Sequence, residues 1–203
     1  GPEANETYRV IIQGPAAERA NVKAQIKERW DFGKDGLTAE VNEKQYQALL
    51  KNKNIKIEKV SEVTLDTART EASSSKKDGV SLEAAGYPSD QTPWGIESIY
   101  NNSSISSTSG GSGIKVAVLD TGVYTNHIDL QGSAEQCKDF TQSTPLVNGS
   151  CTDRQGHGTH VAGTVLAHGG YDGLGIYGVA PQAKLWAYKV LGDNGSGYSD
   201  DIA

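Results

Sequence analysis

The first part of the chain alternates between the spacing of strands and the spacing of helices. Residues 8–12 form a β-rich run that ends at a Gly-Pro pair. Apolar side chains then recur every fourth position from Val22 to Trp30, which predicts a helix over residues 16–30. The pattern therefore opens with a strand followed by an amphipathic helix.

The same alternation continues beyond this helix. Residues 37–41 have the period-two pattern of a strand, and Asn42 is a suitable N-cap for a second helix through Leu50. A last strand is expected over residues 55–63. Residues 7–63 thus predict two helices on one face of a small sheet, an α+β unit of the ferredoxin-like kind. Its size is marginal for folding alone.

A polar segment follows this unit. Residues 64–89 are dominated by Thr, Ser, Ala, Lys and Asp, which favours an exposed linker where proteolytic cleavage would concentrate. Residues 94–100 then form a short amphipathic piece with a globular composition.

The pattern over residues 90–203 is that of an α/β domain. Residues 114–119 form a nearly continuous apolar run, typical of a parallel strand buried on both faces. Residues 157–168 predict a helix rich in small side chains, and residues 184–191 predict another strand. Strand, helix and strand with long connections indicate a parallel sheet. Residues 200–203 have the pattern of a helix start, so we expect the second domain to be cut in its middle.

Composition and charge narrow the function classes. The chain has 19 Lys and Arg against 25 Asp and Glu, a net charge of −6, and the excess of acid lies after residue 63. An acidic second region argues against nucleic acid as a partner and fits a secreted protein or a cation binder. No run of about 18 apolar residues is present, so we expect no membrane span.

The two cysteines leave two alternatives. Cys137 and Cys151 could be buried free thiols, or they could close a polar loop as a disulfide. We favour the disulfide, which would stabilise the fold by about 3 kcal/mol for a loop of this size and implies an oxidising compartment.

Two short motifs carry the candidate chemistry. Asp120 follows an apolar strand and precedes Thr-Gly, and an Asp at that end of a parallel strand can accept the Nδ1 hydrogen of an imidazole. His157 lies between two glycines at a predicted helix start. Taken singly, Asp120 could cap a turn and His157 could be structural. Together they supply two of the three groups that activate a serine nucleophile.

Together the motifs resemble those of the subtilisin-like serine proteases, which use the chain order Asp, His, Ser. Residues 118–123 (Val-Leu-Asp-Thr-Gly-Val) are similar to the aspartate motif, and residues 157–164 (His-Gly-Thr-His-Val-Ala-Gly-Thr) nearly match the histidine motif. The resemblance implies that His157 deprotonates a serine and that Asp120 orients it. The family's nucleophile motif, Gly-Thr-Ser-Met-Ala, and its oxyanion-hole asparagine lie C-terminal to this position. We therefore expect these residues alone to be inactive.

The same resemblance implies a peptide-binding edge. Taken alone, residues 192–198 are a flexible loop with an exposed tyrosine. In the family, a similar Gly-Ser-Gly edge pairs with extended substrate backbone, as in strand addition, and this gives broad specificity. The residues implied are Gly195, Ser196 and Gly197 for the main chain of a protein or peptide substrate, and Tyr198 for a pocket upstream of the cut.

A calcium site is implied in the same way. Calcium takes six to eight oxygen ligands, and a glycine-rich loop such as residues 169–176 can direct its carbonyls inward. The loop is about two residues longer than expected for subtilisins proper, so the ligand set is open. The expected ligands are the side chains of Asp129, Asp172 and Gln91 (or Asp90) and the carbonyls of Leu174 and Ile176.

A zinc site is the alternative for the two histidines. Zinc-protease helices space their histidines at i and i+4 with a Glu between them, whereas His157 and His160 are three positions apart. Asp153 and Cys151 are residue types that could serve as the remaining zinc ligands, but only the residue types support this. We interpret His160 as a packed, hydrogen-bonded structural histidine.

The N-terminal unit resembles, more loosely, the inhibitor prodomain of the same proteases. Such prodomains act as intramolecular chaperones and as product-like inhibitors, so the segment from Val63 to Thr67 would lie in the substrate groove. Self-cleavage would fall between residues 63 and 92, with the neighbourhood of Thr67-Ala68 favoured. The resemblance rests on residues 8–12, 36–39 and 55–63.

These observations predict a secreted, extracellular, calcium-dependent serine endopeptidase precursor. It would consist of a prodomain over 7–63, a linker with the processing region over 64–89, and the N-terminal part of a peptidase domain over 90–203. A C-terminal fragment that carries the serine is the expected partner. The alternative is a binding protein, in which the prodomain on an inactive scaffold inhibits proteases in trans.

Overall fold

The computed structural model describes residues 6–66 and 88–203. These residues fall into two compact units, and each is described by itself. The first unit comprises the chain up to Val63 together with residues 143–145 and 198–203. The second unit comprises the described residues within 64–142 and 146–197.

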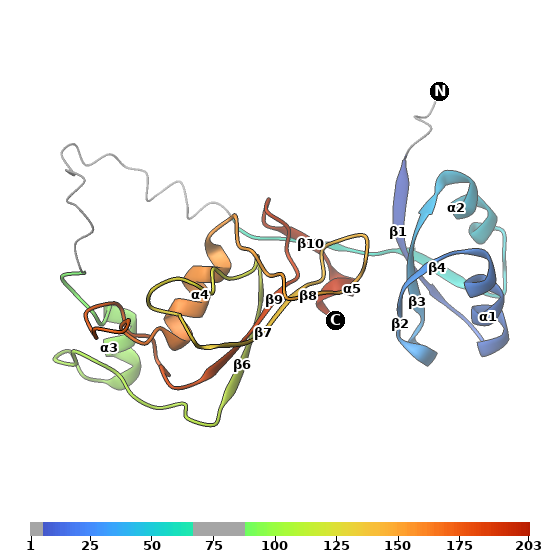
Figure 1. Ribbon diagram of the computed structural model, residues 1–203. Helices are drawn as coiled ribbons and strands as arrows, with labels where there is room; N and C mark the ends of the chain where they lie inside the picture. Colours follow the sequence, from blue (N-terminus) through green and yellow to red (C-terminus); the bar gives the residue numbers. More distant parts are fainter. Residues whose placement is uncertain (1–5, 67–87) are drawn as a thin grey trace. The chain divides into compact units, whose positions relative to one another are not determined.

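The first unit is an antiparallel sheet with two helices. Its strand order is β2-β3-β1-β4, which with the chain order strand, helix, strand, strand, helix, strand is the ferredoxin-like arrangement. Both helices lie on the same side of the sheet (Figure 1), as the sequence predicts. The elements are β1 (Thr7–Gln13), α1 (Ala16–Gln25), β2 (Glu28–Asp31), the 3-10 turn Gly33–Asp35, β3 (Leu37–Asn42), α2 (Glu43–Leu50) and β4 (Lys56–Lys59).

An apolar core lies between this sheet and its helices. The inward positions of β1 and β3 alternate as their sequences require, and α1 and α2 contribute one apolar stripe each. Asn42 caps α2 as expected, because its side chain accepts from the Gln45 N–H while the Gln45 side chain accepts from the Asn42 N–H. The buried core residues are Val10, Ile12, Val22, Ile26, Leu37, Ala39, Val41 and Leu49.

Two expectations for this unit are wrong. The helix predicted to reach Trp30 ends at Gln25, and Trp30 lies in β2, where it pairs with Thr38 of β3. Backbone pairing with a neighbouring strand outweighs the helical spacing of three apolar side chains. The last predicted strand is also divided, into β4 and β5 (Glu62–Thr64).

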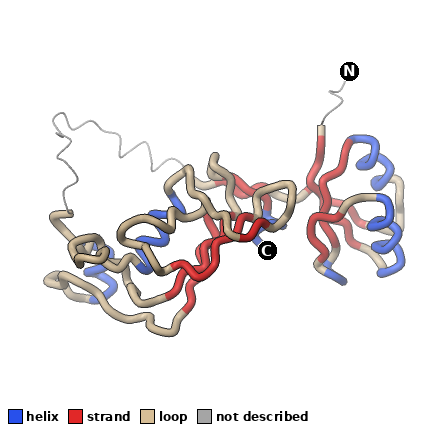
Figure 2. Tube along the Cα trace, viewed as in Figure 1, coloured by secondary structure: helices blue, strands red, loops and turns tan. Residues whose placement is uncertain are grey.

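The second unit is built on a mostly parallel sheet. Its strand order is β6-β9-β7-β8; β9 pairs in parallel with β6 and β7, and β8 is antiparallel to β7. The helix α4 packs against β6 and β9, and Figure 2 shows the strands and helices of this unit among long loops. The elements are α3 (Trp94–Tyr100), β6 (Lys115–Asp120), β7 (Ala134–Asp139), β8 (Val147–Asn148), α4 (His157–Leu166) and β9 (Lys184–Lys189).

The sequence predicted the parallel sheet but not its details. The predicted burial of residues 114–119 on both faces is wrong: β6 is an edge strand, and Leu119 is 43% exposed on the face away from α4. The strand β7 was not predicted, because Ala-Glu-Gln-Cys-Lys-Asp lacks an apolar run. The predicted helix over 157–168 ends two residues earlier, at Leu166.

The last elements of the chain are short. β10 (Ser196–Tyr198) and β5 form a two-stranded sheet. The last helix, α5 (Ser199–Ile202), belongs to the first unit, where the Ser199 N–H donates to the Ser61 carbonyl at 2.9 Å. Within the described ranges, every helix is too short or too polar to cross a bilayer.

Candidate active site

Asp120 and His157 meet at the carboxyl end of the parallel sheet. Asp120 is the last residue of β6, and His157 is the first residue of α4. His157 Nδ1 lies 2.9 Å from both carboxylate oxygens of Asp120. Asp120 is 7% exposed, whereas the His157 side chain is 45% exposed. A buried carboxylate thus holds one ring nitrogen, and the ring itself remains accessible.

This pairing depends on glycine next to the histidine. A Cβ on Gly158 would lie 2.0 Å from the carbonyl oxygen of Gly122, so only glycine allows the start of α4 to approach the turn after β6 this closely. The Gly158 N–H donates to the hydroxyl of Thr121 at 3.0 Å. The residues flanking Asp120 and His157 therefore join their two elements directly.

Asp153 fixes the start of α4 from the other side. Its Oδ1 accepts from the Thr121 hydroxyl at 2.9 Å and from the Gly156 N–H at 2.8 Å, and its Oδ2 accepts from the Thr159 N–H at 2.9 Å. Burial favours the neutral carboxyl, but these hydrogen bonds favour the carboxylate more, and together they lower the pKa of Asp153. The sequence suggested Asp153 only as a zinc ligand. The structure instead shows it linking the segments of Asp120 and His157.

Lys189 supports the same region from β9. Its buried amine donates to the carbonyls of Thr121 and Thr152, both at 2.9 Å, and to Asp193 Oδ1 at 2.7 Å. The hydrogen bond from Lys189 lowers the pKa of the Asp193 carboxyl. Lys189 belongs to no motif in the sequence. A lysine at the end of an otherwise apolar strand was the available indication.

Cys137 and Cys151 form the favoured disulfide. Cys151 is therefore not available to a zinc ion, and His157 Nδ1 is engaged by Asp120. In the described part of the chain, no group of three His, Cys, Asp or Glu residues is arranged to hold a metal. The geometry thus favours the serine-activating interpretation of His157 over the zinc alternative.

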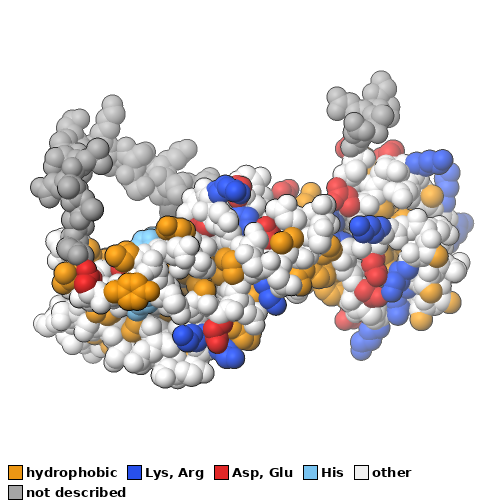
Figure 3. Space-filling model, viewed as in Figure 1, with side chains coloured by type: hydrophobic (Ala, Val, Ile, Leu, Met, Phe, Trp, Pro, Cys, Tyr) orange, Lys and Arg blue, Asp and Glu red, His pale blue; other side chains and the backbone are white. Residues whose placement is uncertain are grey.

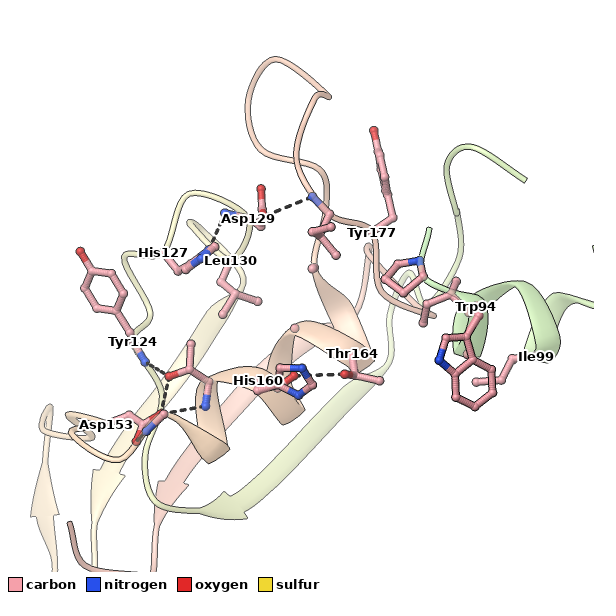
Figure 4. Close-up of a pocket in the computed structure, with 18 residues that line it drawn as sticks. Trp94, Ile99, Tyr124, His127, Asp129, Leu130, Asp153, His160, Thr164 and Tyr177 are labelled. Carbon is pink, nitrogen blue, oxygen red and sulfur yellow. Dashed lines mark hydrogen bonds between the residues drawn. The ribbon is translucent and has the colours of Figure 1, made fainter. Parts of the chain in front are cut away.

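The environment of His160 differs from the one that the sequence predicts. It is exposed, and its ring has no hydrogen bond with the described residues, so the predicted packed, hydrogen-bonded histidine is wrong. The reason is its position: α4 turns this side chain toward an open cavity of about 940 Å³ (Figure 4). Thr164 of the same helix borders the cavity, and Trp94 and Ile99 of α3 lie at its other end.

Large apolar side chains are exposed around this cavity. Trp94 is 80% exposed, Ile99 63% and Tyr124 57%. Figure 3 shows hydrophobic side chains on the visible face of the second unit. An apolar surface of this kind is typical of a surface that another polypeptide covers.

The predicted peptide-binding edge has an extended segment beside it. Within the second unit, the Leu65 N–H donates to the Gly195 carbonyl at 2.9 Å, and the hydroxyls of Thr64 and Ser196 lie 3.0 Å apart. A Cβ on Gly197 would lie 2.3 Å from the Val190 carbonyl oxygen, so glycine is required there. In the first unit, the ring of Tyr198 lies under the Arg9 guanidinium, 4.3 Å from its centroid.

Two of the predicted calcium ligands, Asp129 and Asp172, lie close together in the second unit. Asp129 is 7% exposed, and its Oδ1 is buried with no hydrogen-bond partner among the described residues. A Cβ on Gly170 would lie 3.4 Å from Asp129 Oδ1 and 3.5 Å from Asp172 Oδ1, so both carboxylates face one small space. Such a donor set fits a hard cation.

The other expected ligands are engaged in the same loop. The Gln91 side-chain amide donates to the carbonyls of Gly173 and Gly175 at 2.7 and 2.9 Å. The Ile176 carbonyl accepts from the Gly169 N–H, and the Leu174 N–H donates to Asp172 Oδ1. The Ile176 carbonyl therefore has one remaining lone pair for a cation.

The pairing of Asp120 with His157 is of the kind that serine proteases use, and comparison with known proteins shows which proteins this chain is similar to. Residues 111–203 match the Subtilase family. Subtilisin from Bacillus sp. strain TA39 is 56% identical over 202 residues, which cover 99% of this chain and 46% of that protein. Subtilisin Savinase from Lederbergia lenta is 44% identical over 55% of this chain and 38% of that protein. The chain thus spans less than half the length of these relatives.

Comparison with solved structures also finds similar proteins. Sphericase is 70% identical with a TM-score of 0.55, over 56% of this chain and 37% of that chain. An epidermin leader peptide processing serine protease from Staphylococcus aureus aligns over 93% of this chain and 44% of its own, with a TM-score of 0.60. At 23% identity this last match shows the fold alone. Residues 111–203, which include Asp120 and His157, are thus the part of the chain that matches the Subtilase family.

Proposed function

We propose that the chain is the N-terminal part of a secreted subtilisin-like serine endopeptidase precursor. The observation that carries this proposal is the Asp120–His157 pair, with 2.9 Å between His157 Nδ1 and each carboxylate oxygen. A donor hydrogen on Nδ1 leaves Nε2 free to take the proton of a serine hydroxyl. The serine oxygen then attacks a peptide carbonyl, the C–N bond breaks, and the amine leaves with the proton that His157 took from the serine. Water activated by His157 in the same way then hydrolyses the acyl-enzyme and restores the serine hydroxyl.

The serine would come from a C-terminal polypeptide. Support comes from the relatives, of which this chain covers less than half, and from the exposed apolar surface around the cavity bordered by α3 and α4. In this proposal the C-terminal polypeptide covers that surface and brings its serine to His157 Nε2. His157 would act first as the general base and then as the general acid that protonates the leaving amine, and Asp120 would orient it.

Labelling with a fluorophosphonate tests this division of roles. Co-expression with the region that follows the matched part of the Bacillus relative should give labelling on that partner only. The matched variant His157→Gln should abolish labelling while co-purification persists. Labelling of this chain by itself would contradict the proposal, because it would require a nucleophile among its own residues.

For residues 7–63 we propose the role of prodomain, followed by a linker over 64–89. The ferredoxin-like sheet supports this, and so does the extended segment at Thr64 and Leu65, which lies along Gly195 and Ser196 as a product-like strand would. The favoured processing site at Thr67-Ala68 lies outside the described residues. Recovery of a precursor cleaved in this segment, with the N-terminal fragment still bound, would support the role.

We further propose that Asp129, Asp172, Leu174, Ile176 and Gln91 hold a calcium ion. The buried, unpartnered Asp129 Oδ1 supports this, because a buried carboxylate oxygen without a donor is costly unless a cation neutralises it. When bound, the ion would stabilise the loop after α4. Thermal unfolding with calcium and with EGTA tests this, and an unchanged midpoint would count against it.

The alternative function is a protease-binding protein that never receives a serine. The same co-expression experiment separates the two: partner capture without fluorophosphonate labelling would favour the binding protein. The Asp120–His157 geometry favours the enzyme, because a binding scaffold has no need of an imidazole held at both carboxylate oxygens.

A further inference from the structure

The first unit contains a buried charge cluster that the proposed chemistry does not use. Asp200 and Asp201 of α5 are each 6% exposed. Arg9 Nη1 lies 3.1 Å from Asp200 Oδ1 and 3.2 Å from Asp201 Oδ2. Arg29 Nε lies 2.7 Å from Asp201 Oδ1. The side chains of both arginines are also buried, so two positive and two negative charges meet away from water.

Neutral donors complete the coordination of both carboxylates. Trp30 Nε1 donates to Asp201 Oδ1 at 2.8 Å, and the Thr38 hydroxyl donates to Asp200 Oδ2 at 2.9 Å. With Arg9 of β1 and Arg29 of β2, these donors of β2 and β3 come from three neighbouring strands of one sheet. We name this surface the carboxylate-pair site; its members are Arg9, Arg29, Trp30 and Thr38.

A site of this kind contributes selectivity more than affinity. Removing charges from water is costly, and their mutual attraction repays that cost only when every partner is present. A partner that lacks one carboxylate would leave two buried arginine side chains facing a single negative charge, which is unfavourable. A charge mismatch at a buried position therefore lowers the affinity for partners that lack the acidic pair, and this raises specificity.

We propose that the carboxylate-pair site recognises two adjacent acidic residues at a helix start, and that it determines which subtilase this N-terminal sheet binds. Asp200 and Asp201 are the occupants in this chain, and other chains would compete only if they carry the same acidic pair. The inference rests on the proposed role of residues 7–63 as a prodomain. It adds the chemical feature by which that prodomain selects its protease.

The chain offers a matched control for the two aspartates. Glu40 is the third acid beside Arg9, at 3.8 Å from Nη2, but its side chain is 55% exposed. An exposed ion pair contributes little, because water and salt screen it. Glu40→Gln therefore removes one negative charge from the same arginine without leaving a buried charge unpaired.

The test uses the full chain with a site-specific protease sequence inserted between Lys77 and Asp78. After cleavage, dissociation of the N-terminal fragment is measured by native mass spectrometry over a dilution series. Asp201→Asn and Asp200→Asn should each raise the dissociation constant by at least about 30-fold. Glu40→Gln should change it by no more than about threefold.

Hydrogen exchange of the Trp30 indole N–H is a second measurement, and it reports directly on the contact with Asp201. In the uncleaved chain its hydrogen exchange should be slow, because it donates to buried Asp201, and Asp201→Asn should accelerate it. The indole signals of Trp94 and Trp186, in the second unit, report whether that unit remains folded in each variant.

The outcomes separate the two proposals. If the fragments of the unsubstituted chain separate at once on cleavage, the prodomain role fails, and this inference fails with it. If they stay together and both aspartate variants bind as tightly as the unsubstituted chain, the recognition site is refuted while the prodomain role stands. Equal weakening by Glu40→Gln would also refute it, because the effect would then be general electrostatics.

Discussion

Two glycines in α4 should respond in opposite directions to the same substitution. Gly158→Ala places a Cβ 2.0 Å from the Gly122 carbonyl oxygen, whereas a Cβ on Gly163 meets no atom within 4 Å. In an open helical position, alanine stabilises by about 1 kcal/mol relative to glycine. Gly163→Ala should therefore raise the stability of α4 by up to that amount.

At Gly158 the helical gain is outweighed. Ordinary contacts begin near 3.4 Å, so the helix start must move by more than 1 Å away from a backbone atom that has no rotamer to change. Overpacking of this kind costs about 3 kcal/mol at the upper end of its usual range. After subtraction of the helical gain, Gly158→Ala should destabilise by about 2 kcal/mol. It should also weaken the His157–Asp120 contact.

Hydrogen exchange of the α4 amides measures both variants in the full chain. Exchange should slow in Gly163→Ala and accelerate in Gly158→Ala, by about 30-fold for a loss of 2 kcal/mol. A neutral or stabilising Gly158→Ala would refute the reasoning, since the close approach to Gly122 would then carry no constraint.

Three further predictions concern the surroundings of the site. Hydrogen bonds lower the pKa of Asp153, so the ionised carboxylate stabilises the fold above the unfolded pKa of about 3.9, and this contribution is lost as the pH falls through the folded value. Asp153→Asn should destabilise by about 1–2 kcal/mol at pH 7, with a difference that shrinks below pH 4 in urea unfolding, and a difference independent of pH would contradict this assignment. Replacement of Cys137 and Cys151 by serine should cost about 3 kcal/mol in urea unfolding, and a loss under about 1 kcal/mol would show that the loop is already constrained. Calcium should raise the thermal midpoint of the chain but not of Asp129→Asn, while the exposed control Glu135→Gln keeps the full response; an equal response in all three would place the ion elsewhere.

Much of the fold was predictable because its determinants are local. The capping box of α2 needs only Asn42 and Gln45, and the period-two pattern of β3 needs only its own residues. The parallel sheet followed from the order of strand, helix and strand. These features depend on neighbours in the sequence, and for such features reading the pattern is sufficient.

The errors arose where distant segments compete with local pattern. The spacing from Val22 to Trp30 predicted a helix, but pairing with β3 makes Trp30 part of a strand. Leu119 reads as buried, but β6 is an edge strand with α4 on one face only. The roles of Asp153 and Lys189 were not recognised because they join distant segments through the Thr121 hydroxyl and the carbonyls of Thr121 and Thr152, and such contacts leave no motif in the sequence.

The sequence by itself determined the chemical groups and their order: an aspartate after a strand, a histidine between glycines, and two cysteines in a polar loop. The tertiary structure decided which groups meet. It brought Asp120 to His157 across 37 positions, and it brought Arg29 to Asp201 across 172. The physical reason is that a motif fixes only local backbone geometry. Burial of a charge is tolerable only where the whole fold supplies its partner.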